Sequence, residues 1–251
     1  MFYLILTILL FGLSFLSGMM GLGVAFIATP VLGLFGLELK HEIMPLSLWL
    51  NGITAIASAV TLARKGMVDW RTALPLLIIT TIVAPIGVWL LQFVPTTTVW
   101  WIYVGVLVFL AYRMVFPPTQ DDSQPTVISD ATRVKAGFAS AAIGIFAGFL
   151  GVGPGFLLMP TLVLLGYTAR IAAATNAVIV TLPSFSAFAT HLLDARFDWL
   201  LLIPTSISAV LGAQAGAAFM AKRVKSLTLT RIFAAALMAL ALQRAWLLVG
   251  G

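Results

Sequence analysis

The residues best suited to chemistry in this chain are neutral, and they lie on two apolar stretches, 43–63 and 171–190. In the first stretch they recur every three or four residues, which places them on one face of a helix. Hydroxyl and amide groups can replace water around a small oxyanion. A buried amide is costly unless it is hydrogen-bonded, so we predict that Asn51 and Asn176 bind a ligand. The candidate binding residues from these stretches are Ser47, Asn51, Thr54, Thr175 and Asn176.

Charged and nucleophilic groups are scarce where a membrane enzyme would need them. There is no cysteine, only two histidines are present, and no acidic residue lies in the middle of an apolar run. A membrane-embedded lipid phosphatase would need an acid, a base and phosphate-binding cations close together. We therefore expect no enzyme, no catalytic residue, no metal site and no cofactor. A buried carboxylate that could relay protons or sodium is also absent from the apolar runs.

Two further stretches combine glycine with a terminal proline. They are "GLGVAFIATP" at residues 21–30 and "GVGPGFLLMP" at residues 151–160. A helix that breaks at such a stretch leaves free N–H groups and a positive dipole end on the next helix, which favours anions. Close helix packing through small residues is the alternative explanation. The candidate binding residues here are Gly21, Gly23, Gly151, Gly153 and Gly155.

The composition predicts an integral membrane protein. Of the 251 residues, 61% are hydrophobic and 9% are charged, whereas a soluble domain has about 25% charged residues. Apolar runs of helical length predict an all-α bundle of about 8–10 membrane helices rather than a barrel. The start of the chain lacks a basic region, so we do not expect a cleaved signal peptide. The net charge of +6 reflects membrane topology, and we expect the lipid bilayer, not nucleic acid, as the partner.

The two glycine stretches belong to a longer internal repeat. Aligning them superimposes glycine, phenylalanine and proline positions, and after a small adjustment the dipeptide Asp69-Trp70 meets Asp198-Trp199. We therefore divide the chain into a first membrane repeat at 1–116, a polar cytoplasmic linker at 117–133 and a second membrane repeat at 134–251. The first two apolar runs of each half, 2–17 and 24–37 in the first, are too short for ordinary crossings, so they form short crossings or a re-entrant hairpin.

Loop charge favours an inverted orientation of the two repeats. In that arrangement the connections on one side contain 11 of the 14 basic residues, and the positive-inside rule places them in the cytoplasm. Parallel repeats would place the basic clusters at 64–71 and 222–231 on opposite sides. The 11 residues are Arg64, Lys65, Arg71, Arg113, Arg133, Lys135, Arg170, Lys222, Arg223, Lys225 and Arg231.

The stretches "GMMGLGVAFIATPVLGLFG" and "GFLGVGPGFLLMPTLVLLG", each followed by a polar-dotted helix and a "DW" loop, resemble the two halves of the TauE/SafE family of sulfite exporters and related anion transporters. The resemblance covers nearly the whole chain and implies a multi-pass carrier of sulfite, organosulfonates or similar sulfur-containing anions in a bacterial inner membrane. The family's glycine run usually reads close to G-x-G-G-G. Both copies here depart from it.

Taken together, these features predict a secondary transporter, an exporter by the resemblance, that moves a small anion by alternating access around a site near the midplane. A passive anion channel is the main alternative, since it also uses helix N-termini and hydroxyls. Small residues such as Gly212, Ala215 and Gly216 could support a homodimer or a contact within the chain.

Overall fold

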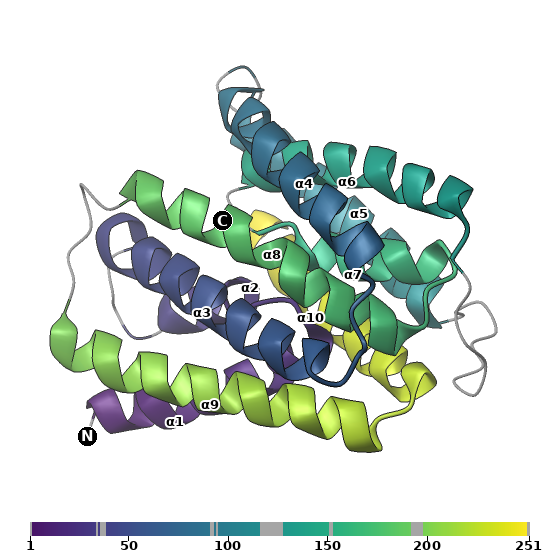
Figure 1. Ribbon diagram of the computed structural model, residues 1–251. Coiled ribbons are helices and arrows are strands. Elements are labelled where there is room, and N and C mark those ends of the chain that lie inside the picture. Colours follow the sequence, from purple (N-terminus) through teal and green to yellow (C-terminus); the bar gives the residue numbers. More distant parts are fainter. Residues whose placement is uncertain are drawn as a thin grey trace.

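The computed structural model describes residues 2–33, 35, 39–90, 93, 95–115, 128–150, 153–191 and 198–249, and these fold into helices joined by short turns (Figure 1). The first half contains α1 (Phe2–Met20), α2 (Ala25–Gly33), a π-helical turn at Leu39–Ile43, α3 (Met44–Ala63), α4 (Trp70–Leu90) and α5 (Thr96–Val115). The second half contains α6 (Asp130–Leu150), α7 (Gly155–Leu164), α8 (Ala169–His191), α9 (Trp199–Arg223) and α10 (Ser226–Val249).

The described helices confirm the all-α membrane fold class. Six of them are long and apolar enough to cross a membrane: α1, α3, α4, α8, α9 and α10. Their outer faces are apolar too. On α4, Leu74, Ile78, Ile82 and Ile86 recur every fourth residue and are all about half exposed. Such a stripe would be a liability in water, and its natural surroundings are lipid chains. The chain is therefore a multi-pass membrane protein.

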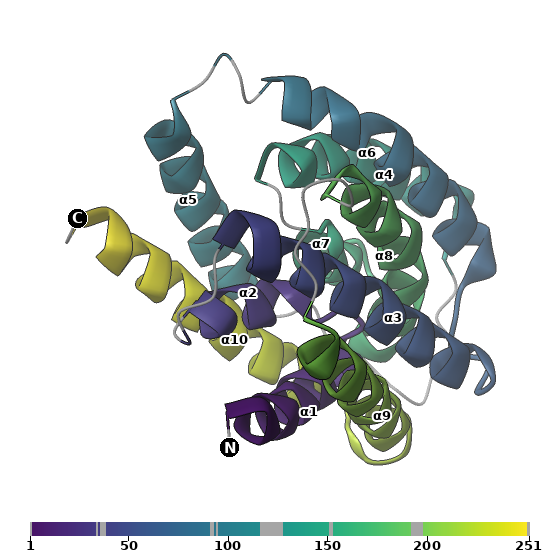
Figure 2. The same ribbon diagram turned by 90° about the vertical axis from the view of Figure 1, so that its left-hand side faces the viewer.

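The two halves of the chain pack against each other through equivalent helices. The first helix of each half lies along the fourth helix of the other, so α1 packs on α9 and α6 packs on α4 (Figures 1 and 2). The third helices, α3 and α8, pack together at the centre, and the fifth helices, α5 and α10, form a pair at one side (Figure 2).

Glycines bring these helices into close contact. A Cβ added at Gly212 or Gly216 of α9 would collide with the α1 backbone at Phe11 or Phe15. A Cβ at Gly144 of α6 would lie 3.1 Å from the Cα of Thr80 on α4. The small-residue face that the sequence left open between a dimer and an internal contact therefore packs inside the chain at Gly212 and Gly216.

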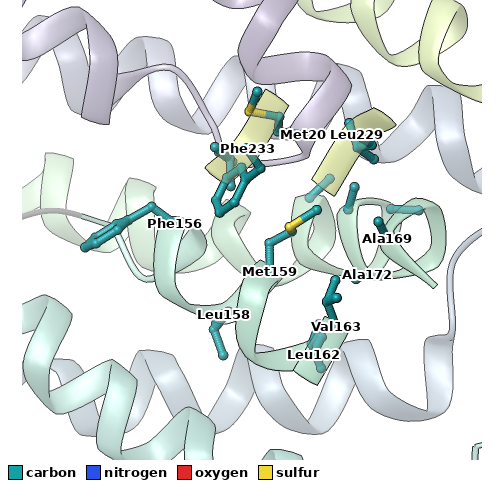
Figure 3. Close-up of a cluster of buried hydrophobic side chains, with 14 of the residues drawn as sticks. Met20, Phe156, Leu158, Met159, Leu162, Val163, Ala169, Ala172, Leu229 and Phe233 are labelled. Atoms are coloured by element: carbon teal, nitrogen blue, oxygen red, sulfur yellow. The ribbon is translucent and has the colours of Figure 1, made fainter. Parts of the chain in front are cut away.

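The short helices are buried inside the bundle. At about 1.5 Å per residue, the 9 residues of α2 and the 10 of α7 reach only about 14–15 Å, half of a hydrocarbon core of about 30 Å. Figure 3 shows Met159 of α7 close to Phe233 of α10, and Phe156 and Met20 belong to the same buried cluster. Met159 and Phe233 have no exposed surface. These two helices are interior elements of the protein.

The helix boundaries differ from the sequence prediction in two places. The first helix extends to Met20 instead of ending near residue 17, because Gly18 stays helical and allows close contact with Ala213 of α9. The helix α6 begins at Asp130, inside the predicted linker 117–133. The rest of that linker up to residue 127 lies outside the described residues.

Candidate functional site

The first glycine stretch ends α1 and starts α2 within a single short turn. Gly21 and Gly23 have φ values of 63° and 73°, which favour glycine. The N–H of Leu22 donates to the carbonyl of Ser17 at 3.3 Å, the six-to-one bond of a Schellman helix end with glycine in the left-handed position. We call residues 21–24 the first break. The predicted interruption of the membrane helix is therefore present.

The carboxamide of Asn51 lies beside the first break and hydrogen-bonds the start of α2. Its Oδ1 accepts from the N–H of Ala25, the first residue of α2, at 2.8 Å, and its Nδ2 donates to Ser184 Oγ at 2.8 Å. Gly23 lies directly against this carboxamide, where a Cβ would collide with it. Asn51, 2% exposed, thus caps the start of α2 from another helix and ties it to α8.

Asn176 joins the first break to the second glycine stretch. Its Nδ2 donates to the carbonyls of Gly21 and Gly155, both at 2.9 Å. The two carbonyls require a nitrogen donor, which fixes the orientation of the amide. Its Oδ1 is fully buried and has no hydrogen-bond partner among the described residues. The two stretches, which belong to different halves of the chain, therefore meet at one side chain.

The second glycine stretch begins α7 at Gly155, after Pro154. We call residues 153–154 the second break. Pro154 is the N-cap residue and supplies no side-chain hydrogen bond. A Cβ on Gly155 would lie 2.8 Å from the carbonyl oxygen of Leu22, while one on Gly153 would meet Asn51 Nδ2 at 3.3 Å. Gly151, also a candidate from sequence, lies outside the described residues. The backbones of the two breaks touch directly.

Two equivalent phenylalanines stack where the breaks meet. Phe26 of α2 and Phe156 of α7 occupy the same position in the two glycine stretches. Their ring centroids are 5.8 Å apart, with an interplanar angle of 2°. Both side chains are buried, at 7% and 1% exposure. The stack therefore joins equivalent positions of the two glycine stretches.

The two asparagines occupy different positions in the repeat. When the halves are aligned on their Asp-Trp pairs, Asn51 corresponds to Val180, and Asn176 corresponds to Ser47. In agreement with this alignment, Gly155 corresponds to Ala25 in the glycine stretches, and a Cβ on Gly155 would press on Val180 Cγ2, while the N–H of Ala25 donates to Asn51 Oδ1. Alignment on the Asp-Trp pairs thus reveals Val180, which sequence reasoning missed.

The hydroxyl candidates divide between the breaks and other contacts. Ser47 is buried, and its Oγ has no partner in the described part of the chain. Thr54 Oγ1 donates to the carbonyl of Leu50 at 2.6 Å, so it is used by its own helix. Thr175 Oγ1 accepts from the N–H of Asp69 at 3.2 Å, which holds it at the loop before α4. The hydrogen bonds of Thr54 and Thr175 therefore do not reach the breaks, and no hydrogen bond among the described residues ties Ser47 to them.

Polar contacts join the two halves at both ends of the bundle. Beside the loop before α4, Thr72 Oγ1 donates to Asp69 Oδ2 and hydrogen-bonds Tyr167 Oη, both at 2.7 Å. Arg133 Nε of α6 lies 3.8 Å from Asp69 Oδ2. Burial raises the pKa of Tyr167, and the bond with Thr72 partly opposes this rise. Tyr167 therefore stays protonated and pairs with Thr72 as a neutral phenol.

The contact at the other end uses equivalent positions. Tyr3 Oη of α1 donates to Asp198 Oδ2 at 2.8 Å, and Asp198 Oδ1 caps the N–H of Leu200 at 2.9 Å. Tyr3 corresponds to Arg133 when the glycine stretches are aligned, and Asp198 is the equivalent of Asp69. Each first helix thus reaches the Asp-Trp loop of the other half.

The remaining candidates for charge or metal chemistry stay away from the breaks. The guanidinium of Arg170 donates to the carbonyl of Ala221 at the end of α9, so it supports that helix end. The described residues contain no group of three His, Cys, Asp or Glu side chains that could hold a metal ion. The chemistry available at the breaks is hydrogen bonding by neutral groups and backbone.

Comparison with known proteins shows the family of this chain. A probable membrane transporter protein, YunE of Bacillus subtilis (strain 168), is 28% identical over 110 residues, which cover 43% of this chain and 40% of that protein. The matched stretch thus spans less than half of the relative. No solved structure gives a significant match. The family model described as sulfite exporter TauE/SafE matches residues 4–244, nearly the whole chain. The chain therefore belongs to the TauE/SafE family of sulfite exporters.

Proposed function

We propose that this protein exports a small sulfur-containing anion, such as sulfite or an organosulfonate, by alternating access around a site at the two breaks. The observation that carries the proposal is their meeting: the carbonyls of Gly21 and Gly155 share the Nδ2 of Asn176. Broken helices at membrane depth occur where protein or a substrate path satisfies the backbone. Paired breaks in two repeats are the recurrent binding architecture of secondary transporters.

The second break supplies the more suitable anion site. The N-cap residue of α7, Pro154, supplies no side-chain hydrogen bond, so the positive end of the α7 dipole is not neutralised by a cap and favours an anion. The start of α2 is different, because Asn51 Oδ1 occupies the N–H of Ala25. Asn51 Nδ2 donates one N–H to Ser184, and a Cβ on Gly153 would lie 3.3 Å from the same nitrogen. An anion at Gly153 would contact donors from both halves.

Alternating access is supported by the reciprocal packing of equivalent helices from the two halves. Helices α1 and α6 each pack on the fourth helix of the other half, and the contacts Tyr3–Asp198 and Arg133–Asp69 lie at their starting ends. If the second repeat is inverted, these contacts lie at opposite faces of the membrane. Breaking one while keeping the other would open the site to one side at a time.

The test is exchange of radiolabelled sulfite across proteoliposomes that contain the purified full chain. A carrier gives saturable exchange that unlabelled substrate on the far side accelerates, whereas a passive channel gives flux without this acceleration. Sulfoacetate, thiosulfate and sulfate serve as competitors to define the substrate. Loading label inside or outside, with and without an imposed ion gradient, determines the preferred direction.

Two variants connect the transport to the second break. We expect Gly153→Leu to fill the space beside Asn51 and to reduce exchange at least about tenfold by excluding the anion. Its control is Gly12→Leu, because Gly12 of α1 has no heavy atom within 4 Å of an added Cβ. If folded Gly153→Leu exchanges sulfite at the wild-type rate, the anion site does not lie at the second break.

A further inference from the structure

Two of the buried side-chain oxygen atoms without hydrogen-bond partners lie in the last two turns of α1, and a third, on Asn176, belongs to a side chain that bonds Gly21. In the described part of the chain, the buried side-chain oxygens of this kind are Ser14 Oγ, Ser17 Oγ, Ser47 Oγ and Asn176 Oδ1. Ser14, Ser17 and Asn176 have no exposed surface. An unpaired buried polar group is destabilising because it has lost its water without gaining a partner, so several in one region call for a ligand.

The two α1 serines, like Ser47, differ from most buried hydroxyls on these helices. The usual solution here is a bond to the carbonyl four residues earlier, which needs no partner from outside the helix. The residues that use it are Thr54, Ser58, Thr80, Ser184, Thr205 and Thr230. The Oγ atoms of Ser14 and Ser17 make no such bond and are free for another ligand.

The serines and Asn176 converge on the same end of α1. Ser14 and Ser17 are three residues apart on α1 and share a helical face, and Gly21 follows Ser17 by four residues, directly after the end of the helix. The carbonyl of Gly21 accepts from Asn176 Nδ2, which places the carboxamide of Asn176 beside the end of α1. The carbonyls at the end of a helix form the negative end of its dipole, even where, as at Ser17 and Gly21, they already accept a hydrogen bond. This region therefore concentrates oxygen atoms and negative potential.

We propose that Ser17 Oγ and Asn176 Oδ1 bind a monovalent alkali cation, Na⁺ or K⁺, together with backbone carbonyls at the end of α1. The donor set contains only neutral oxygens. Calcium and magnesium sites need carboxylates, and zinc prefers histidine and cysteine. Helix ends and unwound carbonyls are suitable for a monovalent cation inside a membrane protein. Cation binding does not rest on the proposed function, although a role as the driving ion does.

The two halves differ at this place, which explains why one cation site is expected. When the glycine stretches are aligned, Ser14 corresponds to Gly144 and Ser17 to Ala147. The second half thus lacks the two hydroxyls. The cation site belongs to the first break, and its oxygen ligands are distinct from the donors proposed to hold the anion at the second.

The experiment is thermal unfolding of the purified full chain in detergent, titrated with NaCl or KCl against choline chloride at constant total chloride. Binding to the folded state alone raises Tm with ligand concentration. We expect a saturable rise with Na⁺ or K⁺ relative to choline, and we expect Ser17→Ala to weaken the apparent affinity about tenfold. Ser14→Ala tests the neighbouring oxygen on the same face.

Ser58→Ala is the matched control, because Ser58 is a buried serine whose Oγ already bonds Thr54. It should keep the wild-type cation response. If choline gives the same curve as Na⁺ and K⁺, or if Ser17→Ala responds to the cations like the wild type, there is no cation site at the end of α1. No sulfur anion is present in this assay, so its result is independent of the exchange experiment at Gly153.

Discussion

The two breaks of this molecule have the same backbone role and different polar surroundings. In the first break, Asn51 caps α2, and free oxygens of Ser17 and Asn176 lie beside the end of α1. In the second, the position equivalent to Asn51 is Val180, and α7 begins without a side-chain cap. We therefore expect the first break to offer hydrogen-bond acceptors to a cation and the second break to offer donors to an anion.

The two proposed sites would give one repeated architecture two functions. Each half needs a glycine stretch to interrupt a helix, and the Phe26–Phe156 stack holds the interruptions together. The side chain that faces the start of the short helix then determines whether the electrostatic potential there stays positive. An amide oxygen cancels the positive helix start, whereas an aliphatic side chain leaves it free. On this view, Asn51 and Val180 are the positions that distinguish the halves.

The largest effect should come from removing the first break's geometry with Gly21→Ala. A Cβ there would collide with the carbonyl oxygen of Ala173, and the φ of 63° disfavours any side chain. A left-handed conformation alone costs about 1–2 kcal/mol, and with overpacking we expect a total of about 3 kcal/mol. Thermal unfolding should show Tm lowered by about 10 °C. A Tm equal to that of Gly12→Ala would contradict the observed contact.

An intermediate effect should come from making the second break resemble the first with Val180→Asn. The new amide oxygen would face the start of α7 near Gly155 and compete with an anion for its N–H groups. We expect sulfite affinity, measured by isothermal titration calorimetry, to fall about tenfold. Val180→Ala, which removes methyl groups without adding an oxygen, is the comparison. Equal affinities in the two variants would show that polarity at position 180 does not set anion binding.

The smallest effect should come from Tyr167→Phe, which removes the hydroxyl group that hydrogen-bonds Thr72 Oγ1 beside the loop before α4. Burial raises the pKa of Tyr167 above its ordinary value of 10.0. The folded state therefore favours the neutral phenol, and wild-type stability should be retained below about pH 10 and decline as pH rises through the raised pKa.

The measurement for this contact is Tm between pH 8 and pH 11 for wild type and Tyr167→Phe. The variant should be less stable at pH 8 by about 1 kcal/mol, because Thr72 loses a partner, and its Tm should fall less steeply above pH 10. Parallel pH curves would mean that Tyr167 does not contribute to the alkaline loss of stability.

Much of the candidate site could be predicted from residue type and local spacing. The helical stripe that contains Ser47 and Asn51, the cost of a buried amide at Asn176, and the duplicated glycines are all visible in a single chain. The hydrogen-bond partners of the Thr54 and Thr175 hydroxyls could not be predicted. Each hydroxyl has several neighbours within reach, and only packing decides whether it bonds its own helix, as Thr54 does, or the Asp69 loop, as Thr175 does.

The sequence by itself determined the membrane class, the family resemblance and the existence of two helix breaks, because these depend on composition and on local backbone preferences of glycine. Only the tertiary structure decided that Asn176 joins Gly21 to Gly155 and that Asn51 caps α2. These contacts join residues that are distant in the chain, and such a pairing follows from the packing of whole helices. No local pattern specifies which distant carbonyl an amide will meet.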